Sequence, residues 1–313
     1  MVMSDILLET HGLTKAYNKR NVVDGVDIHV RKGSIYGLIG RNGAGKTTLM
    51  KMISGMISTT DGTFEYRGIA GGNKAAYSKI GTLIEIPAIM PKLTARENLK
   101  LKCLAYGQDD EKFISDTLQL VGLAKTGKVK AGKFSLGMKQ RLGIALAMAG
   151  NPEILILDEP INGLDPQGIV EMRDMLMKLN RERGMTIIIS SHILAELAKL
   201  ATDYAIIDNG RIVEESTREE LELKCRSKMV FKVGDARTAG AVLKEAGFEG
   251  FEVADEETIN VFDGYEKAPE MNMKICNSGI LVKSFLMETI DLEDYFLNTI
   301  RAGSGAVSVK EAV

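Results

Sequence analysis

The stretch "GRNGAGKTT", at Gly40–Thr48, decides the fold, because it fits the pattern G-x-x-x-x-G-K-[ST]. The short apolar run "SIYGLIG" at Ser34–Gly40 precedes it, and "KTTLMKMISGM", which can form a helix, follows it. A strand that leads through this pattern into a helix is the context in which the pattern marks a phosphate-binding loop. The sequence therefore predicts a nucleotide site here rather than a chance glycine-rich turn.

The anchor positions of this loop each have a chemical reason. Gly40, Gly43 and Gly45 let the backbone curl around a phosphate without Cβ clashes, and the N–H groups and the helix N-terminus then face the anion. Lys46 is expected to reach the β- and γ-phosphates, and the Thr47 hydroxyl is expected to bind Mg²⁺. The remaining loop residues expected to contact the nucleotide are Asn42, Ala44 and Thr48.

A second apolar run, "EILILDEP" at Glu153–Pro160, ends in two acids. Asp158 at the strand end is expected to hold the Mg²⁺ shell, and Glu159 to orient or deprotonate the water that attacks the γ-phosphate. A strand ending in solvated acids is common, but the phosphate loop favours a catalytic interpretation. Because "NKAA" at Asn73–Ala76 fails the guanine pattern N-K-x-D at its last position, we expect ATP rather than GTP.

The composition limits the class of protein. The 313 residues are 45% hydrophobic and 26% charged, which suits one large domain or two smaller ones. The net charge of −2 gives no basic field that would attract nucleic acid. Cys103, Cys225 and Cys276 form no disulfide framework and favour a reducing compartment. We expect neither a signal peptide nor a membrane span, so a role at a membrane would require spans from another chain.

The order of apolar and helical segments predicts an α/β fold with two domains. A third apolar run, "MTIIISSH" at Met185–His192, follows the first two along the chain. Such runs are typical of parallel strands buried on both faces. We expect a first domain at 1–222 with a helical insertion at about 86–150. The segment 223–303 reads as β-α-β-β-α-β, a small α+β domain of split βαβ, ferredoxin-like type. The tail at 304–313 is expected to be loose.

The motifs, taken in order over about residues 7–216, resemble the nucleotide-binding subunit of an ATP-binding cassette (ABC) transporter. The resemblance implies a P-loop NTPase with a mixed sheet core and a helical signature subdomain. It also implies that Tyr17 in "LTKAYNKR" stacks on adenine and that His192 contacts the γ-phosphate. A lone tyrosine or a lone histidine at a strand end is more often structural, but the position of each within the motif order favours these roles.

Two further segments match motifs of this family. "SLGMKQR" falls at its signature, where Ser135 and Gly137 are implied to contact the ATP of a second subunit, and "NGLDP" matches its D-loop, with Asp165 as the aspartate. The family pairs two ATPase subunits head to tail, so each ATP lies between the phosphate loop of one and the signature of the other. An ATP-dependent homodimer is therefore implied.

Two departures from the family pattern stand out. Glu85 replaces a glutamine that reaches Mg²⁺ and the attacking water; its oxygen can still bind the metal, and its charge must be balanced by metal or proton. The alternative is a solvent-facing loop acid. Leu136 and Met138 are unusual in the signature. Together the two departures resemble the bacitracin-resistance and lantibiotic-immunity branch of the family.

The resemblance also implies partners. We expect a separate polytopic membrane subunit, docked near Pro87–Glu97, and a peripheral location on the cytoplasmic face of the cell membrane. Four apolar residues in or beside this segment could instead be core: Ile86, Ile89, Met90 and Leu93. The function implied is ATP hydrolysis that powers export of, or protection from, a drug, antimicrobial peptide or lipid through that membrane subunit. An importer ATPase, or a soluble ABC protein acting on nucleic acid or ribosomes, is the alternative; the missing basic stripe and the single cassette argue against the latter. The C-terminal domain could regulate, dimerise or brace the cassette.

Overall fold

The structure is a computed structural model that describes residues 6–225, 227–262, 264–288 and 292–303. Its contacts divide the chain into two compact units: residues up to Arg218 together with those from Thr299 onward, and residues 219–298. The loose tail expected at 304–313 lies outside the described residues. Among the described residues, no helix combines the length and apolar character that a membrane span requires.

The first unit is built on a mixed sheet in the order β11-β10-β4-β9-β8-β7. Strands β4, β8 and β9 are the three apolar runs of the sequence; they pair in parallel and every residue in them is buried, as predicted. Only β11 runs antiparallel to its neighbour. The strands are β4 (Ile35–Ile39), β7 (Ile80–Leu83), β8 (Ile154–Asp158), β9 (Thr186–Ser191), β10 (Asp203–Asp208) and β11 (Arg211–Thr217).

A second, antiparallel sheet in this unit was not anticipated from the sequence. Its central strand β1 pairs with β2, β3 and β5, and β5 pairs with β6. Leu8 of β1, Met50 of α1 and Ile156 of β8 belong to one core cluster, so apolar side chains of α1 fill the space between the two sheets. The elements are β1 (Ile6–Tyr17), β2 (Arg20–Val26), β3 (His29–Arg31), α1 (Lys46–Ile53), β5 (Asp61–Tyr66) and β6 (Ile69–Ala70).

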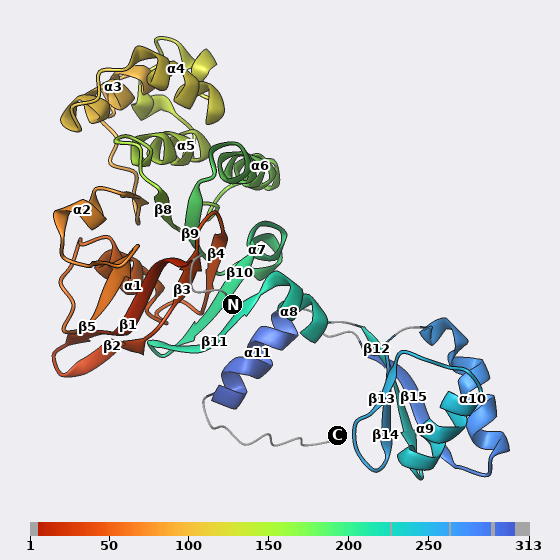
Figure 1. Ribbon diagram of the computed structural model, residues 1–313. Helices are drawn as coiled ribbons and strands as arrows, with labels where there is room; N and C mark the ends of the chain where they lie inside the picture. The colour runs from red at the N-terminus through yellow and green to blue at the C-terminus, as the bar shows by residue number, and fades with distance from the viewer. Residues whose placement is uncertain (1–5, 226, 263, 289–291, 304–313) are drawn as a thin grey trace. The chain divides into compact units, whose positions relative to one another are not determined.

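The predicted helical insertion is present, and Figure 1 shows α3 and α4 gathered beyond α5 at the end of the unit opposite β1, β2 and β5. Thr94 and Glu97 form a capping box that fixes the start of α3. Asp110 caps α4 in a similar way. The helices of this unit are α2 (Lys74–Tyr77), α3 (Ala95–Ala105), α4 (Glu111–Leu120), α5 (Leu136–Ala147), α6 (Pro166–Arg183) and α7 (Leu194–Leu200), with 3₁₀ turns η2 (Ala124–Thr126) and η3 (Ala131–Lys133).

The second unit has the predicted order β-α-β-β-α-β. Its antiparallel sheet, in the order β13-β14-β12-β15, is that of a split βαβ fold, which confirms the α+β prediction. Phe231, Leu243 and Met271 belong to its separate core. The elements are α8 (Arg218–Lys224), β12 (Lys228–Val233), α9 (Ala236–Glu245), β13 (Phe251–Val253), β14 (Thr258–Val261), η4 (Tyr265–Lys267), α10 (Ala268–Asn277), β15 (Val282–Glu288) and α11 (Leu292–Gly303).

These units differ from the predicted domains in two places. The division falls after Arg218 rather than after residue 222, and the end of α11, from Thr299, is grouped with the first unit. The sequence pattern could not locate these points, because α8 and α11 are continuous helices with no composition change at the division.

Candidate nucleotide site

The loop between β4 and α1 is shaped by its glycines. Gly43 and Gly45 have φ values of 83° and 110°, in the left-handed region that favours glycine. Position 40 requires glycine because of packing, since an added Cβ would lie 2.6 Å from the carbonyl oxygen of Ile207. Within the same loop Ala44 is buried and Asn42 is exposed. The backbone around the predicted phosphate position therefore depends on these glycines.

The N-terminus of α1 is suited to an anion. Its N-cap, Gly45, provides no side-chain acceptor, and the first turn contains no acidic residue. The N–H groups of this turn, which includes Thr47 and Thr48, therefore have no side-chain cap and carry the positive end of the helix dipole. Such a terminus binds phosphate oxygens well.

Lys46 lies at the centre of the site. Its Nζ donates hydrogen bonds to the carbonyl oxygens of Gly40 (2.6 Å) and Arg41 (3.2 Å) and lies 3.7 Å from Oε1 of Glu159. The side chain is only 6% exposed. Burial lowers the pKa of Lys46, while the charges of Glu159 and Asp158 act in the opposite direction. An incoming phosphate would offer this ammonium stronger acceptors than the loop carbonyls.

Thr47 and Asp158 meet at the predicted magnesium position. The Thr47 hydroxyl donates to Oδ2 of Asp158 at 2.8 Å, and the Ser190 hydroxyl donates to Oδ1 at 2.7 Å. A hydroxyl and a carboxylate oxygen are hard donors of the kind that Mg²⁺ prefers, so the residues present fit this ion. Ser190 was not singled out in the sequence; it lies in "TIIISSH", but its position opposite Asp158 depends on the register of β8 and β9.

Glu159 and His192 also meet. Oε2 of Glu159 lies 2.7 Å from Nδ1 of His192, and the Glu159 N–H donates to the Ser190 hydroxyl at 2.9 Å. Glu159 has a φ of 50°, which is uncommon for a residue with a side chain and often marks a functional position. The structure thus brings Lys46, Thr47, Asp158, Glu159 and His192 into one cluster.

Glu85 pairs with a residue outside this cluster. Its side chain is 61% exposed, and its Oε1 lies 2.6 Å from Nζ of Lys51 on α1. The ammonium of Lys51 therefore balances the charge of Glu85 in this structure. The expectation that the carboxylate is balanced by metal or proton when ATP is bound stays a prediction. The sequence did not indicate this pair, because Lys51 and Glu85 lie 34 positions apart in the chain. Glu85 also has a φ of 60°, which residue types alone do not predict.

We expect Glu85→Gln to raise the Mg²⁺ concentration that half-saturates ATP hydrolysis by about tenfold, the usual scale for losing a group that supports a metal site. The reason is that a neutral amide binds the cation less strongly than a carboxylate. The pH profile of the rate should change as well. Lys51→Gln is the matched control, because it removes the ion pair but keeps the carboxylate. Identical Mg²⁺ and pH dependence in Glu85→Gln and the parent would count against a metal role.

Tyr17 ends β1 and is half-exposed, so its ring is available for stacking. Nζ of Lys15 lies 5.1 Å from the ring centroid. A cation over one face of the ring leaves the other face for a planar base. The predicted adenine contact is compatible with this position.

The signature and the D-loop form a second, separate group. Ser135 caps α5 by accepting a hydrogen bond from the Met138 N–H at 3.3 Å, and Asp165 caps α6 by accepting one from the Gly168 N–H at 3.0 Å. One surface hollow is lined by residues of both caps, Gly137 included, and none of its described lining residues belongs to the phosphate loop. One chain therefore holds its predicted site residues in two groups, and the hollow at the second group is lined by no described residue of the phosphate loop.

Leu136 has a structural explanation that the sequence did not provide. Its Cδ2 would lie 3.1 Å from a Cβ added at Gly163, which itself has a φ of 74°. The leucine side chain therefore rests against the D-loop backbone, and glycine at position 163 leaves the space for it. This contact covers part of the leucine side chain, which stays 47% exposed.

The chain matches the family model for ABC transporters over residues 23–162. It is 40% identical to the bacitracin transport ATP-binding protein BcrA of Enterococcus faecalis, over 97% of this chain and 99% of that protein. It is 41% identical to the lantibiotic transport ATP-binding protein SrtF of Streptococcus pyogenes, over 72% of this chain and 99% of that protein. The ADP conformation of MJ1267, an ATP-binding cassette of an ABC transporter, shares the fold with a TM-score of 0.64 at 26% identity, over 71% of this chain and 94% of that one.

Proposed function

This chain belongs to the family of ABC transporter ATP-binding subunits, and from that premise we propose that it hydrolyses ATP to drive export of, or protection from, an antimicrobial peptide. The observation that carries the peptide class is the match to a bacitracin transport ATP-binding protein over 97% of this chain. That match extends past the cassette, since the solved cassette MJ1267 covers only 71% of the chain.

Hydrolysis would use the cluster around Lys46. The N–H groups of the loop and the Lys46 ammonium would hold the phosphates, and Thr47 and Asp158 would hold Mg²⁺. When bound, the ion neutralises charge on the β- and γ-phosphates. Glu159, beside His192, would take the proton of the attacking water. The distances among these side chains support this assignment.

Two copies of the chain would complete each ATP site. The phosphate loop and the exposed Ser135 lie in different groups of one subunit, which supports a head-to-tail homodimer closed by ATP. The N-terminus of α5 would add a favourable dipole at the γ-phosphate of the partner's nucleotide. Hydrolysis removes these contacts, so ATP and ADP would favour different states of the dimer.

A groove beside the predicted insertion is our candidate docking surface for a separate membrane subunit. It is lined by Met56, Ile84, Ile86 and Tyr106, and Ile86 is 82% exposed. Exposed apolar side chains that gather in one groove mark interaction sites more often than isolated ones do. Sequence reasoning left open whether Ile86 is core; it is not. Docking there would hold the subunit at the cytoplasmic face of the membrane.

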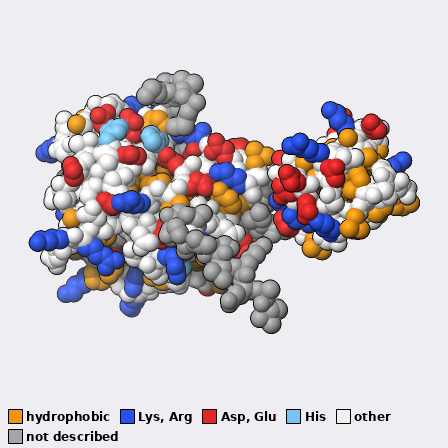
Figure 2. Space-filling model, turned by 90° about the horizontal axis from the view of Figure 1, so that it is seen from below, with side chains coloured by type: hydrophobic (Ala, Val, Ile, Leu, Met, Phe, Trp, Pro, Cys, Tyr) orange, Lys and Arg blue, Asp and Glu red, His pale blue; other side chains and the backbone are white. Residues whose placement is uncertain are grey.

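Nucleic acid is not a proposed partner. Figure 2 shows the lysine and arginine side chains of the visible face as separate groups and not as a continuous basic stripe. A nucleic-acid surface would gather basic residues on one face.

The proposal is tested by producing the chain together with a polytopic membrane protein that co-purifies with it from membranes, in a bacitracin-sensitive and lantibiotic-sensitive strain. We expect the pair to raise the inhibitory concentration of one of these peptides. Ile86→Asp should abolish protection, because a charge in an apolar contact costs about 2 kcal/mol or more, roughly a 30-fold weaker complex. Its isolated ATPase rate should stay unchanged.

Val129→Asp is the matched control, since Val129 is an exposed apolar residue outside the groove. It should keep both protection and co-purification with the membrane protein. A parent pair that protects against no peptide would refute the peptide class. Equal protection by Ile86→Asp and the parent would refute the docking surface alone.

A further inference from the structure

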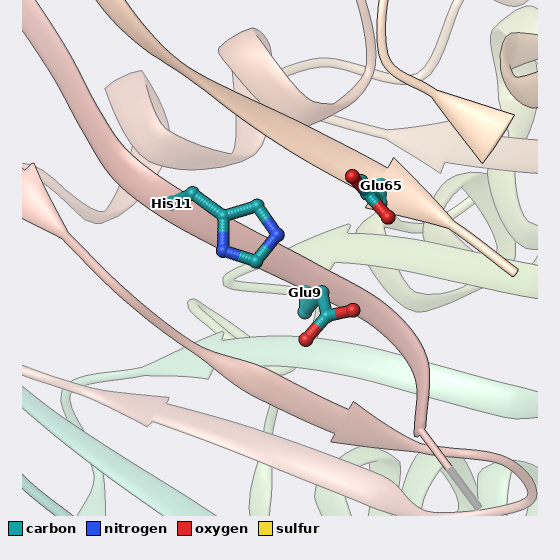
Figure 3. Close-up of side chains that lie close together, drawn as sticks. All are labelled: Glu9, His11 and Glu65. Carbon is teal, nitrogen blue, oxygen red and sulfur yellow. The ribbon is translucent and has the colours of Figure 1, made fainter. Parts of the chain in front are cut away.

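We propose that Glu9, His11 and Glu65 bind a divalent transition-metal ion, with Zn²⁺ as the ion that fits best. The three side chains lie on the antiparallel sheet, two on β1 and one on β5, and share no residue with the nucleotide site (Figure 3). They are the candidate metal group found among the described residues, and the proposed ATP chemistry does not use them.

Strand geometry places the three on one face. Glu9 and Glu65 are direct partners in the antiparallel register of β1 and β5. His11 follows Glu9 by two positions, so its side chain points to the same face of the sheet. Their ligand atoms all lie within 4.8 Å of one another. The arrangement depends on the backbone register, and not on a flexible loop.

The charges at this place are unbalanced. Two carboxylates directly opposite each other across strands destabilise the pairing. Within the described ranges, neither Glu9 nor Glu65 forms an ion pair with a lysine or arginine. His29 on β3 is the partner of Glu9 on its other side, but its Nδ1 lies 2.8 Å from the Glu215 carboxylate. A bound cation would remove the repulsion between Glu9 and Glu65.

The donor set indicates the kind of ion. Imidazole favours zinc, copper or nickel over magnesium and calcium, and carboxylates are common additional ligands of zinc. Bond lengths of about 2.0–2.2 Å place tetrahedral ligands roughly 3.4 Å apart, so the side chains must converge by roughly 1–1.5 Å. His11 is exposed and both glutamates are partly exposed, so rotamer changes allow this. Water would fill the fourth position.

The test is a calorimetric titration of nucleotide-free, EDTA-treated full-length protein with ZnCl₂, repeated with CoCl₂ to record the Co²⁺ absorption spectrum. We expect one Zn²⁺ per chain, and a rise of several degrees in Tm because the ion binds only the folded state. His11→Ala and Glu65→Gln should each weaken binding by at least about tenfold and remove the Tm rise. Millimolar Mg²⁺ should not compete.

His192→Ala is the control, because His192 and Glu159 are an alternative place for Zn²⁺. It should leave zinc binding intact. Circular dichroism of His11→Ala should match the parent, since the side chain is exposed. The proposal is overturned if the parent takes up no Zn²⁺ at micromolar concentration, or if His192→Ala loses the ion while His11→Ala keeps it.

Discussion

Glu159→Gln should slow ATP hydrolysis by about 10²–10⁴-fold, the range that a positioned general base contributes. The carboxylate lies between Nζ of Lys46, at 3.7 Å, and Nδ1 of His192, at 2.7 Å. Glutamine keeps the size and the hydrogen-bonding reach of the side chain but cannot accept a proton from water. The binding of ATP through the loop and Lys46 should persist. Phosphate release in a single turnover measures the loss.

The same variant should accumulate as an ATP-bound dimer. If Ser135 of a partner contacts the γ-phosphate, only hydrolysis releases that contact, so a subunit that cannot hydrolyse stays closed. Light scattering with saturating ATP should report twice the mass of the chain. Glu182→Gln, an exposed acid on α6, is the control and should turn over normally. A Glu159→Gln protein that remains monomeric, or hydrolyses ATP at the parental rate, contradicts these roles.

Sequence patterns identified the parts of the site whose positions depend on near neighbours in the chain. Lys46 and Thr47 directly follow Gly45 at the start of a helix, and Glu159 directly follows Asp158, which ends a buried strand. Since a parallel sheet aligns the ends of its strands, these groups meet once the three apolar runs pair. The α/β class and the split βαβ unit followed from segment order in the same way.

The sequence did not predict contacts that depend on strand register or on backbone dihedral angles. Ser190 faces Asp158 because of the alignment of β8 and β9. Lys51 forms an ion pair with Glu85, a residue that adopts a φ of 60°. Neither the alignment of two strands nor a positive φ at a residue such as glutamate can be recognised from residue types. Leu136 seemed an anomaly for the same reason, since its partner at Gly163 lies in another motif.

The sequence did not predict the antiparallel sheet, because buried and exposed residues do not alternate regularly along β1. Register shifts interrupt its pairing with β2, β3 and β5, and a bulge moves side chains off the period of two. Glu9, His11 and Glu65 therefore looked like scattered polar residues. The proposed zinc site could be found only after Glu9 and Glu65 were known to be partners.

Lys46→Ala should weaken ATP binding and lower kcat/KM for ATP by about 10²–10³-fold, the scale for removing one preorganised donor from a water-excluded charge site. Lys46 is the buried cation beside Glu159 and Asp158, and its pKa is lowered by that burial. Without it, the triphosphate would face two carboxylates with one positive charge fewer. Titration with a fluorescent ATP analogue measures affinity separately from turnover.

Two further variants, Lys46→Arg and Lys51→Gln, are the controls. They test whether ATP binding requires the lysine ammonium at position 46 or only a positive charge near the phosphates. Arginine keeps the charge, but its planar fork does not fit a pocket in which a lysine is 6% exposed, so it should not restore binding. Lys51→Gln removes a nearby charge that pairs with Glu85, and it should bind ATP within a few-fold of the parent. Thermal unfolding without nucleotide checks that each variant is folded. If Lys46→Ala binds ATP as the parent does while folded, the phosphates must be held by the N–H groups of the loop alone, and the assignment of Lys46 is wrong.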